Sequence, residues 1–324
     1  MNSTTNVMPD GTADFRVLIC DSIAPNGVAL VRQQVQVDDQ TGIEAGQLSQ
    51  IIDRYQGLIV RSRTKLTADL LAHAQQLKII ARAGVGLDNI DLQAAKQHGI
   101  VVINTPEATT ITVAEHTLAL ILALIRNIPQ ANASIKTGNW EKRMFIGKEL
   151  AGKTLGIIGV GRIGQAVANR ARSFGLNLLG YDPYVSEELL DQLNIQSVQL
   201  QDLYSLSDLI TVHTPLNQNT RGMINAEAIA AMKPGVLLIS TSRGGIIEEQ
   251  ALLAGLQTGQ VGGAALDVFE TEPPGLNNLI SHPNLIATPH IAAQTKDAQE
   301  RAATQAAEEI IRFVKGLPLR WQIV

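Results

Sequence analysis

Short apolar runs alternate with amphipathic segments along most of the chain. Four runs rich in β-branched residues predict the first strands, at Phe15–Cys20, Leu58–Val60, Lys78–Ala81 and Ile100–Ile103. Between them, segments such as Thr67–Ala74 and Asp91–His98 place apolar residues at helical spacing and polar residues on the opposite face. Strands that alternate with helices in this way are typical of βαβ units, so a parallel sheet is expected.

A second series of the same kind begins near Lys153. Its predicted strands are Thr154–Ile158, Leu176–Gly180, Leu209–Val212, Val236–Ser240, Gly263–Leu266 and Leu285–Ala287. Two α/β sheets in 324 residues indicate two domains, because one hydrophobic core rarely serves a chain of this length. The predicted fold class is therefore α/β, with two doubly wound parallel-sheet domains of the Rossmann or flavodoxin type and a cleft between them.

Long helical patterns flank the second series, at about Thr112–Arg126 and Lys296–Lys315. We therefore expect the chain to cross between the domains twice, so that the C-terminal segment completes the first domain. The predicted parts are a flexible tail of residues 1–14, a first domain of residues 15–104 plus 295–324, and a second domain of residues 105–294.

The composition is that of an ordinary globular protein, with 45% hydrophobic residues, 17% charged residues and a formal net charge of −4. This mild acidity argues against a nucleic-acid partner. The most apolar stretch, Ile111–Ile125, is interrupted by Glu115 and His116 and is too short for a bilayer, so no membrane partner is expected. The single cysteine, Cys20, and the lack of a signal-peptide pattern favour the cytoplasm. The position of Cys20 at the end of a predicted strand predicts a buried, inert thiol.

The segment Gly159-Val-Gly-Arg-Ile-Gly164 follows a predicted strand and opens a predicted helix. Its first glycine would allow a tight turn, Gly161 would let a pyrophosphate approach, and the third would let helix and strand pack closely. Asp182, at the end of the next strand, would accept hydrogen bonds from ribose hydroxyls and repel a 2′-phosphate. NAD is therefore the expected cofactor, which makes 105–294 an NAD-binding domain and the other a substrate-binding domain. The alternative for the glycine segment is a turn with a purely structural role, and the alternative for Asp182 is a solvated residue at a strand end.

Arg243, Glu272 and His290 each lie near the end of a predicted strand in the NAD-binding domain. Because the carboxyl ends of parallel strands meet at one edge of a sheet, these side chains can converge. His290 would take the hydroxyl proton as hydride leaves C2, Glu272 would fix the imidazole, and the Arg243 fork would hold a carboxylate. The set predicts hydride transfer on a small 2-hydroxy acid, with no metal. Taken singly, His290 could be a loop histidine and Arg243 an ion-pair partner, and Glu270 competes with Glu272.

With these motifs the chain resembles the D-isomer-specific 2-hydroxyacid dehydrogenases, from about Phe15 to Pro318. Further matching segments are Val60–Lys65, Ala81–Asp91, Asn104–Pro106, Val113–Thr117, Ile128–Ala131, Lys153–Ile157 and Val212–Pro215. The resemblance implies an NAD-dependent dehydrogenase. It is strongest to members that oxidise a phosphorylated 2-hydroxy acid, D-3-phosphoglycerate, to 3-phosphohydroxypyruvate in the first step of L-serine biosynthesis.

The resemblance also implies roles for individual residues. The implied substrate-binding residues are Arg61, Ser62, Gly84, Val85, Gly86, Arg243 and His290. The implied cofactor-binding residues are Val85, Gly159, Gly161, Arg162, Ile163, Gly164, Asp182, His213, Thr214, Pro215, Thr241, Ser242, Asp267 and Ala292. Family members also pair into dimers through the segment that corresponds to Trp140–Phe145, where Lys142 or Arg143 could bind the phosphate of a neighbouring subunit's substrate. A solvated face is the alternative for these two residues, and for Arg63 and Lys65.

Some positions depart from the family pattern. Ser240 stands where relatives more often have Asn, and Ala292 and Gln294 stand where many phosphoglycerate-oxidising members have Gly and Ser. Another D-2-hydroxyacid dehydrogenase or reductase activity, on glyoxylate, hydroxypyruvate or D-lactate, therefore stays open. An NAD-sensing binding protein of the same fold is a remote alternative. We expect a homodimer without the C-terminal serine-sensing domain of longer members; the direction of reaction and any effectors are left open.

Overall fold

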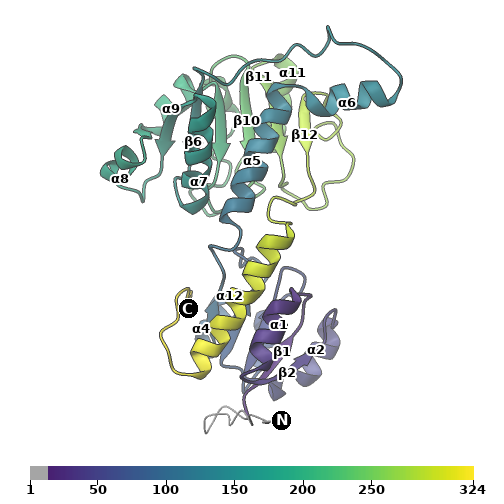
Figure 1. Cartoon of the computed structure of the whole chain (residues 1–324), viewed down its shortest axis with the longest axis vertical. Coiled ribbons are helices and arrows are strands. Elements are labelled where there is room, and N and C mark those ends of the chain that lie inside the picture. The colour runs from purple at the N-terminus through teal and green to yellow at the C-terminus, as the bar shows by residue number, and fades with distance from the viewer. Residues whose placement is uncertain (1–13) are drawn as a thin grey trace, which may run out of the picture. The chain divides into compact units, whose positions relative to one another are not determined.

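The computed structural model describes residues 14–324, which divide into two compact units. Unit 1 comprises the described residues up to Thr109 together with Gln294–Val324, and unit 2 is Thr110–Ala293 (Figure 1). The first crossing lies five residues beyond the predicted boundary at 104/105. Residues 105–109 belong to unit 1 because Thr105 donates its N–H to Gly84 O at 2.9 Å and Ala108 is fully buried in the core of that unit.

Unit 1 is built on a five-stranded parallel sheet with the order β2-β1-β3-β4-β5. Its strands are β1 (Arg16–Ile19), β2 (Gln36–Asp39), β3 (Gly57–Val60), β4 (Ile79–Arg82) and β5 (Val101–Ile103). The order reverses between β1 and β3, where Leu18 is in register with Leu58. This is the flavodoxin-like doubly wound arrangement, which places a topological switch point at the carboxyl ends of β1 and β3.

Helices cover both faces of this sheet, because successive strand residues point to opposite sides. Leu18, Leu58 and Ile80 pack with the first set of helices, and Val17 and Ile59 pack with the second. The first set is α2 (Ala45–Ile51), the 3₁₀ turn η1 (Ile52–Arg54), α3 (Ala68–Ala72) and α4 (Leu92–Gln97), and the second is α1 (Pro25–Arg32) and α12 (Lys296–Val314). The end of the chain returns to the sheet, where Ile323 N–H donates to Val102 O at 2.8 Å.

The close packing of α1 on α12 depends on a glycine. Gly27 of α1 lies opposite Ala303 of α12, and a Cβ atom at Gly27 would come within 2.5 Å of the Ala303 carbonyl oxygen. The missing side chain therefore lets the two helices lie side by side over one face of the sheet (Figure 1). Thr295 caps the N-terminus of helix α12, because its hydroxyl accepts Ala298 N–H at 3.1 Å, and the helix ends before Gly316, which adopts a positive φ of 64°.

Unit 2 is built on a seven-stranded parallel sheet with the order β12-β11-β10-β9-β6-β7-β8. Its strands are β6 (Thr154–Ile158), β7 (Asn177–Tyr181), β8 (Gln196–Ser197), β9 (Leu209–Val212), β10 (Val236–Ser240), β11 (Val261–Leu266) and β12 (Leu285–Ala287). Strands β6 to β11 have the Rossmann order, and β12 extends it by one strand. The order reverses between β6 and β9, so this sheet has its switch point at the carboxyl ends of those two strands.

The seven-stranded sheet is also covered on both faces. One core joins Ile157 and Leu209 to α5 (Thr110–Ile125), α7 (Arg162–Ala171) and α8 (Glu187–Gln192), and the other joins Ile158 and Val212 to α9 (Leu200–Leu206), α10 (Ala226–Ala230) and α11 (Glu249–Thr258). The 3₁₀ turn η2 (Arg172–Phe174) continues α7, and α6 (Ile128–Lys136) follows α5. Both predicted doubly wound α/β sheets are therefore confirmed.

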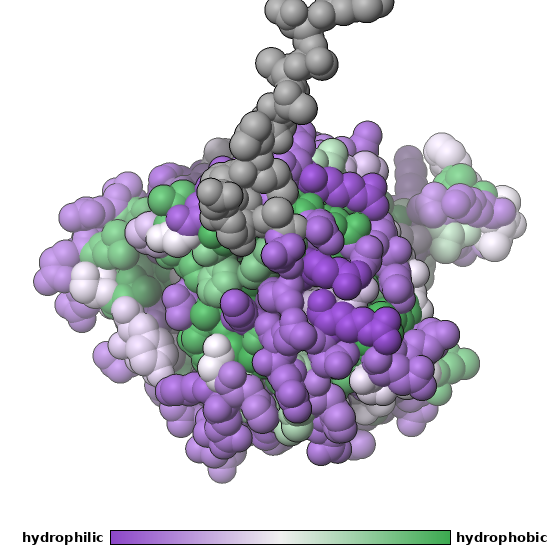
Figure 2. Space-filling view, turned by 90° about the horizontal axis from the view of Figure 1, so that it is seen from below, coloured by the Kyte–Doolittle hydropathy of each residue, from purple (hydrophilic) through white to green (hydrophobic). Residues whose placement is uncertain are grey.

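Helix α5 covers the most apolar stretch of the sequence, and most of its side chains are buried. In the part of the chain that the structure describes, no single helix is long and apolar enough to cross a membrane. Length and composition alone would let α5 and α6 pass together as a bent pair, with 63° between them. Polar residues dominate the face of the molecule drawn in Figure 2, with apolar residues gathered in smaller patches between them.

Two strands were not predicted, and both lie at sheet edges. Strand β2 has the polar sequence Gln-Val-Asp-Asp, and Asp38 there pairs with Arg16 at 2.7 Å and accepts the Tyr55 hydroxyl proton at 2.8 Å. Strand β8 is only Gln196–Ser197. Edge strands lack a neighbour on one side and need not be apolar, so the apolar pattern that marks central strands is missing from them.

Replacing Gly27 by Ala should destabilise the protein by about 1–3 kcal/mol, because the new methyl group meets the backbone of α12. Gly46→Ala is the matched control: Gly46 also lies in a helix of unit 1, but its Cβ would meet nothing within 4 Å, so this change should be neutral or mildly stabilising. Thermal unfolding of the two variants checks this. A Gly27→Ala variant as stable as the wild type would contradict the account of the α1–α12 contact.

Candidate active site

The residues predicted to bind the cofactor and to perform the chemistry in unit 2 lie along one edge of its sheet, beyond the carboxyl ends of six strands. The glycine loop follows β6, Asp182 follows β7, His213-Thr-Pro215 follows β9, Thr241-Ser-Arg243 follows β10, Asp267 follows β11 and Thr288–Ala292 follows β12. Ligands of doubly wound sheets bind at this edge, at the point where the strand order reverses. Here that point lies between the glycine loop and His213-Thr-Pro215.

The three glycines of the loop have different surroundings. Gly159 has a φ of +88°, and a Cβ there would lie 2.8 Å from the His213 carbonyl. A Cβ at Gly164 would lie 2.2 Å from Gly159 O, so this glycine lets α7 pack on the loop. A Cβ at Gly161 would meet nothing within 4 Å. Gly161 therefore leaves open space beside the start of α7, whose free N–H groups favour an anion such as a pyrophosphate.

Asp182 and Thr214 also fit a bound dinucleotide. The Asp182 carboxylate accepts Val160 N–H at 2.8 Å and Tyr184 N–H at 2.9 Å, which fixes it beside the glycine loop. Each carboxylate oxygen can accept a second hydrogen bond, so capacity remains for ribose hydroxyls. The buried Thr214 hydroxyl has no hydrogen-bond partner within residues 14–324. A buried unpaired hydroxyl next to Gly159 is a place where a ligand supplies the missing partner.

Other residues that the resemblance assigns to the cofactor are engaged within the protein. Thr241 is buried and shares a hydrogen bond with Thr117 of α5, at 2.9 Å. The His213 ring lies 3.0 Å from the Thr211 hydroxyl, and burial lowers its pKa to about 3, so it is neutral at physiological pH. Arg162, Ile163, Pro215 and Ser242 lie on the same edge of the sheet, where their roles remain predictions.

His290 and Glu272 form a hydrogen-bonded pair. The imidazole Nδ1 lies 2.7 Å from Glu272 Oε2, and the other carboxylate oxygen accepts Phe269 N–H at 3.1 Å. Both side chains are partly exposed, at 48% for His290 and 38% for Glu272. The second carboxylate of this segment, Glu270, instead accepts the N–H of Glu249 at the start of α11, at 3.0 Å. In return the Glu249 carboxylate accepts Glu270 N–H at 2.7 Å. Of the two candidates, Glu272 is the one placed to orient the imidazole.

The loop that carries His290 is held by the buried carboxylate of Asp267. Asp267 accepts hydrogen bonds from the Thr288 hydroxyl at 2.6 Å and from the N–H groups of Ile291 and Ala292 at 2.9 and 2.8 Å. The His290 N–H donates to Asp267 O at 2.9 Å, and His290 adopts a positive φ of 51°. Burial acts to raise the pKa of Asp267, but the hydrogen bonds from His116, Thr288 and the two amides lower it overall. A charged Asp267 therefore fixes an uncommon backbone conformation at His290.

Arg243 is half-buried in a loop that packs closely on the same segment. Its Nη1 donates to Ser242 O at 2.8 Å. A Cβ at the next residue, Gly244, would lie 1.8 Å from Phe269 O, so only glycine allows this approach. The Arg243 loop and the segment that leads to Glu272 are thus held together through backbone contact.

The predicted substrate residues Arg61, Ser62 and Gly84–Gly86 lie in unit 1, beyond the carboxyl ends of β3 and β4. The carbonyls of Gly84 and Val85 accept hydrogen bonds from Thr105 N–H and from the Asn104 amide, at 2.9 and 2.8 Å. No backbone carbonyl in residues 14–324 accepts a hydrogen bond from the N–H groups of Gly84, Val85 or Gly86. Backbone N–H groups that are not used within the protein can bind an anion, and the resemblance implies that this loop binds the substrate carboxylate.

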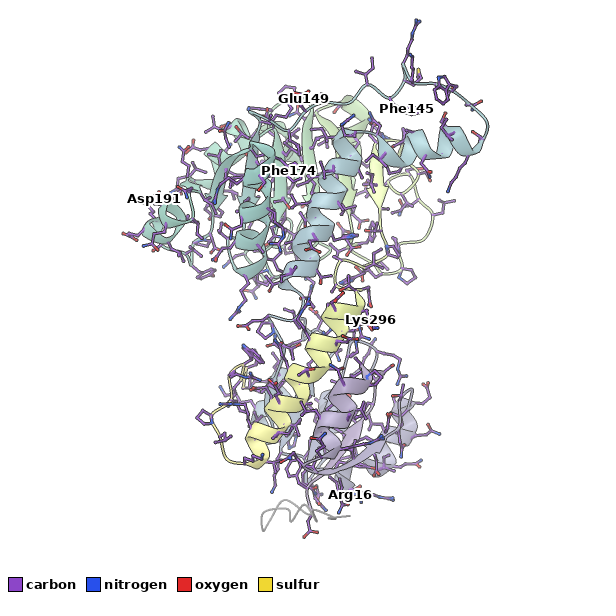
Figure 3. All side chains as sticks on the ribbon, in the orientation of Figure 1. Arg16, Phe145, Glu149, Phe174, Asp191 and Lys296 are labelled. Atoms are coloured by element: carbon purple, nitrogen blue, oxygen red, sulfur yellow. The ribbon has the colours of Figure 1, made fainter. Side chains whose placement is uncertain are left out.

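Lys142 and Arg143 are exposed, in the segment that follows α6 and in which Figure 3 labels Phe145. Large apolar side chains next to them are exposed as well. Cys20 is fully buried, as predicted, and burial raises the pKa of its thiol to about 12.

Two further residues, His116 and Thr288, belong to this site and were not predicted from the sequence. His116 lies on α5 with its Nε2 3.3 Å from the Thr288 hydroxyl and 3.6 Å from Asp267 Oδ1, so both side chains support the Asp267 carboxylate. The available signal was a polar pair, Glu115 and His116, inside a largely apolar helix. A polar residue in such a helix needs a buried partner, which the sequence alone does not identify.

The family model for the D-isomer specific 2-hydroxyacid dehydrogenase, NAD binding domain, matches residues 118–292. The chain therefore belongs to the D-isomer-specific 2-hydroxyacid dehydrogenase family and contains its NAD-binding domain. It is 47% identical over 307 residues to the D-3-phosphoglycerate dehydrogenase of Bacillus subtilis (strain 168), which covers 94% of this chain and 58% of that protein. The same enzyme of Synechocystis sp. is 47% identical, with 94% and 55% covered.

The chain thus spans a little over half the length of these curated relatives. Among solved structures, a glyoxylate reductase from Paecilomyes thermophila superposes with a TM-score of 0.88 at 27% identity, over 96% of this chain and 98% of that one. The fold and family are shared across members that differ in substrate.

Replacing Asp182 by Ala should raise the dissociation constant for NAD about tenfold or more, because a charged acceptor for ribose hydroxyls is lost. Affinity for NADP should fall less, since like-charge repulsion of the 2′-phosphate is lost too. Titration calorimetry with both dinucleotides measures the two effects, and Asp191→Ala, an exposed carboxylate in α8, serves as the control. Unchanged NAD affinity in Asp182→Ala would show that this carboxylate does not bind the cofactor.

Proposed function

We propose that this protein is an NAD-dependent dehydrogenase that oxidises D-3-phosphoglycerate to 3-phosphohydroxypyruvate, the reaction that opens L-serine biosynthesis. The observation that carries the proposal is the 2.7 Å hydrogen bond between His290 and Glu272, at the same sheet edge as the glycine loop of the NAD-binding domain. The choice of substrate is supported by 47% identity to D-3-phosphoglycerate dehydrogenases over 94% of the chain.

His290 is the acid and base of the proposed reaction. With Nδ1–H donating to Glu272, the opposite ring nitrogen, Nε2, is left unprotonated and can accept the proton of the C2 hydroxyl. The Glu272 carboxylate then stabilises the imidazolium that forms. NAD, when bound, accepts the hydride from C2. In the reverse direction His290 returns the proton to the carbonyl oxygen.

Binding of the substrate is divided between charged side chains and backbone N–H groups. The Arg243 guanidinium can hold the carboxylate and polarise the C2 oxygen, since its planar fork matches two acceptor oxygens. In unit 1, the backbone N–H groups of Gly84, Val85 and Gly86 are the donors that the resemblance assigns to the substrate carboxylate. Arg61, beyond the end of β3, is the proposed contact for the phosphate.

We further propose that the protein is a homodimer. The segment after α6 exposes Trp140, Met144 and Ile146 by 81%, 75% and 80%, and exposed apolar side chains of this size gathered in one segment mark association surfaces. Lys142 and Arg143 within it could contact the substrate of a partner subunit. A cytoplasmic location, and the lack of nucleic-acid and membrane partners, are also part of the proposal.

The proposal is tested by initial rates of NADH formation with D-3-phosphoglycerate, D-glycerate, D-lactate and 2-hydroxyglutarate. D-3-phosphoglycerate should give the highest kcat/KM, and D-glycerate, which differs from it only by the phosphate, should be much poorer. Turnover confined to acids without phosphate would retain the mechanism at His290 and reject the proposed substrate. Binding of NAD without turnover of any acid would favour a sensor protein instead.

Changing His290 to Ala should lower kcat by about a hundred- to ten-thousandfold, since a general acid and base is removed. The dissociation constant for NAD should stay within about twofold, because the glycine loop and Asp182 are untouched. Glu272→Gln should give a smaller loss of kcat, because the imidazole keeps a hydrogen-bond partner and loses the charge. Near-normal turnover by His290→Ala would exclude the catalytic assignment.

A further inference from the structure

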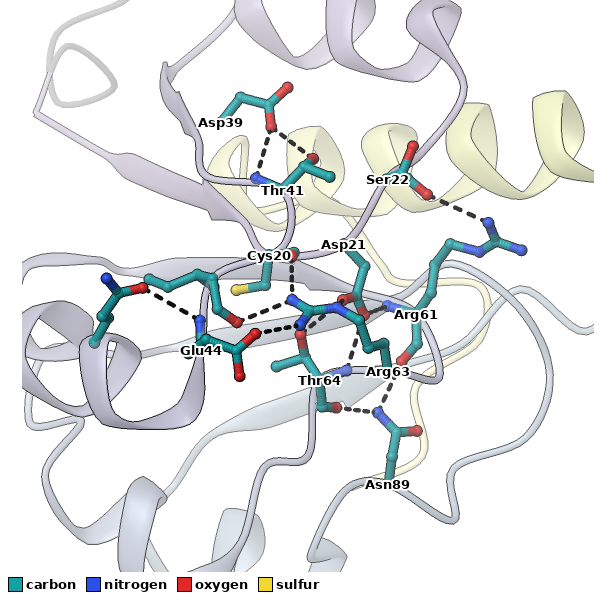
Figure 4. A network of polar contacts seen from close by, with 12 residues as sticks. Cys20, Asp21, Ser22, Asp39, Thr41, Glu44, Arg61, Arg63, Thr64 and Asn89 are labelled. Atoms are coloured by element: carbon teal, nitrogen blue, oxygen red, sulfur yellow. Dashed lines mark hydrogen bonds and ion pairs between the residues drawn. The ribbon is translucent and has the colours of Figure 1, made fainter. Parts of the chain in front are cut away.

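In unit 1, a buried carboxylate holds the loop that carries the proposed phosphate contact. Asp21 follows β1, is 3% exposed, and faces Arg61–Thr64 beyond the end of the neighbouring strand β3. Its Oδ2 accepts the N–H groups of Arg61 and Thr64 at 2.6 and 3.2 Å, and its Oδ1 accepts the Thr64 hydroxyl at 2.7 Å. Figure 4 shows these donors converging on the one carboxylate. The contact lies at the topological switch point of the sheet.

Arg63 and Arg61 differ in what their guanidinium groups contact. Arg63 donates to Asp21 Oδ1 at 3.1 Å and to the carbonyls of Cys20 and Ile43 at 3.2 and 2.9 Å (Figure 4). Arg61 donates to one carbonyl, that of Ser22 at 3.3 Å, and its guanidinium makes no ion pair with a carboxylate anywhere in residues 14–324. The donors of Arg63 are therefore used to hold the protein together, while those of Arg61 remain available for an anion.

The carbonyl groups of the same loop are held from the other side. The Asn89 amide donates to Arg61 O at 2.8 Å and to Thr64 O at 2.7 Å (Figure 4). Asn89 lies in the segment that begins with Gly84–Gly86, the proposed carboxylate contact. The loop is thus fixed between Asp21 and Asn89, and the two segments proposed to bind the substrate in unit 1 are joined.

We propose that Asp21 is a positioning residue, supported by Arg63, that sets the backbone of the Arg61 loop so that the Arg61 guanidinium meets the substrate's phosphate. This inference rests on the proposed function and assigns separate roles to the neighbouring arginines. Four donors point at Asp21, and only a carboxylate can accept from all of them. An Asn side chain would turn two of its own N–H donors toward this cluster, so the loop would lose its fixed geometry.

The test is a double-mutant cycle of Asp21→Asn and Arg61→Ala in the full-length protein. Either single change should raise KM for D-3-phosphoglycerate about ten- to a hundredfold, because a small displacement of a binding group is costly. Since Asp21 acts through Arg61, the double variant should be no worse than Arg61→Ala alone. NAD affinity should be unchanged in all three variants, because the cofactor residues of unit 2 are untouched.

Asp38→Asn is the matched control, since Asp38 also pairs with an arginine in unit 1, at the edge strand β2. It should leave KM for D-3-phosphoglycerate within about twofold of the wild type, even if it lowers the unfolding temperature to the same degree. Arg63→Ala should also raise KM for D-3-phosphoglycerate, because the Asp21 carboxylate loses the guanidinium that pairs with it at 3.1 Å.

The outcomes are distinct. The positioning role would be overturned if the increases in KM caused by Asp21→Asn and Arg61→Ala multiplied in the double variant. It would also be overturned if Asp21→Asn had the same KM as the control Asp38→Asn. In either case the proposed function would stand. A wild-type protein that oxidises D-2-hydroxy acids but not D-3-phosphoglycerate would overturn the proposed function, and this inference with it.

Discussion

The geometry of the candidate active site depends on one buried interaction, the carboxylate of Asp267 with the loop after β12. A charged group is costly to bury unless donors surround it, and here Thr288, two backbone amides and His116 do so. The loop must close around the carboxylate to satisfy it. This closure carries His290 into its positive φ and toward Glu272. His290, the proposed acid and base, is thus placed by a carboxylate that has no part in the proposed proton transfer.

The two units use the same device at the carboxyl edges of their sheets. Asp21 in unit 1 and Asp267 in unit 2 each follow a buried parallel strand, and each accepts backbone and hydroxyl donors from the loop after a neighbouring strand. The loops that follow the carboxyl ends of parallel strands are not restrained by the hydrogen bonds of the sheet. A buried carboxylate at this edge supplies the restraint, so functional side chains on loops can have fixed positions.

The central parts of the fold could be predicted from the sequence because burial on both faces makes a strand uniformly apolar. Four strands of unit 2, among them Thr154–Ile158 and Val236–Ser240, have the predicted bounds. The edge strands β2 and β8 are polar and gave no signal. Strand ends also located the candidate site, since a motif after a strand must lie at the carboxyl edge of the sheet.

The sequence alone could not predict which of two chemically equivalent side chains takes the functional position. Glu270 and Glu272 differ in the structure because Glu249, at the start of α11, binds the first of them. Arg61 and Arg63 differ because Asp21 and two carbonyls bind the second. Such choices depend on residues distant in the chain, so local patterns do not contain them.

The central claim is that hydride leaves C2 of D-3-phosphoglycerate and is accepted by NAD while His290 takes the hydroxyl proton. The most direct measurement uses D-3-phosphoglycerate with deuterium at C2, followed by mass spectrometry of the nicotinamide product. The account predicts that deuterium appears in NADH and that none is exchanged with water. A reduced cofactor without deuterium, or no reduced cofactor at all, would contradict it.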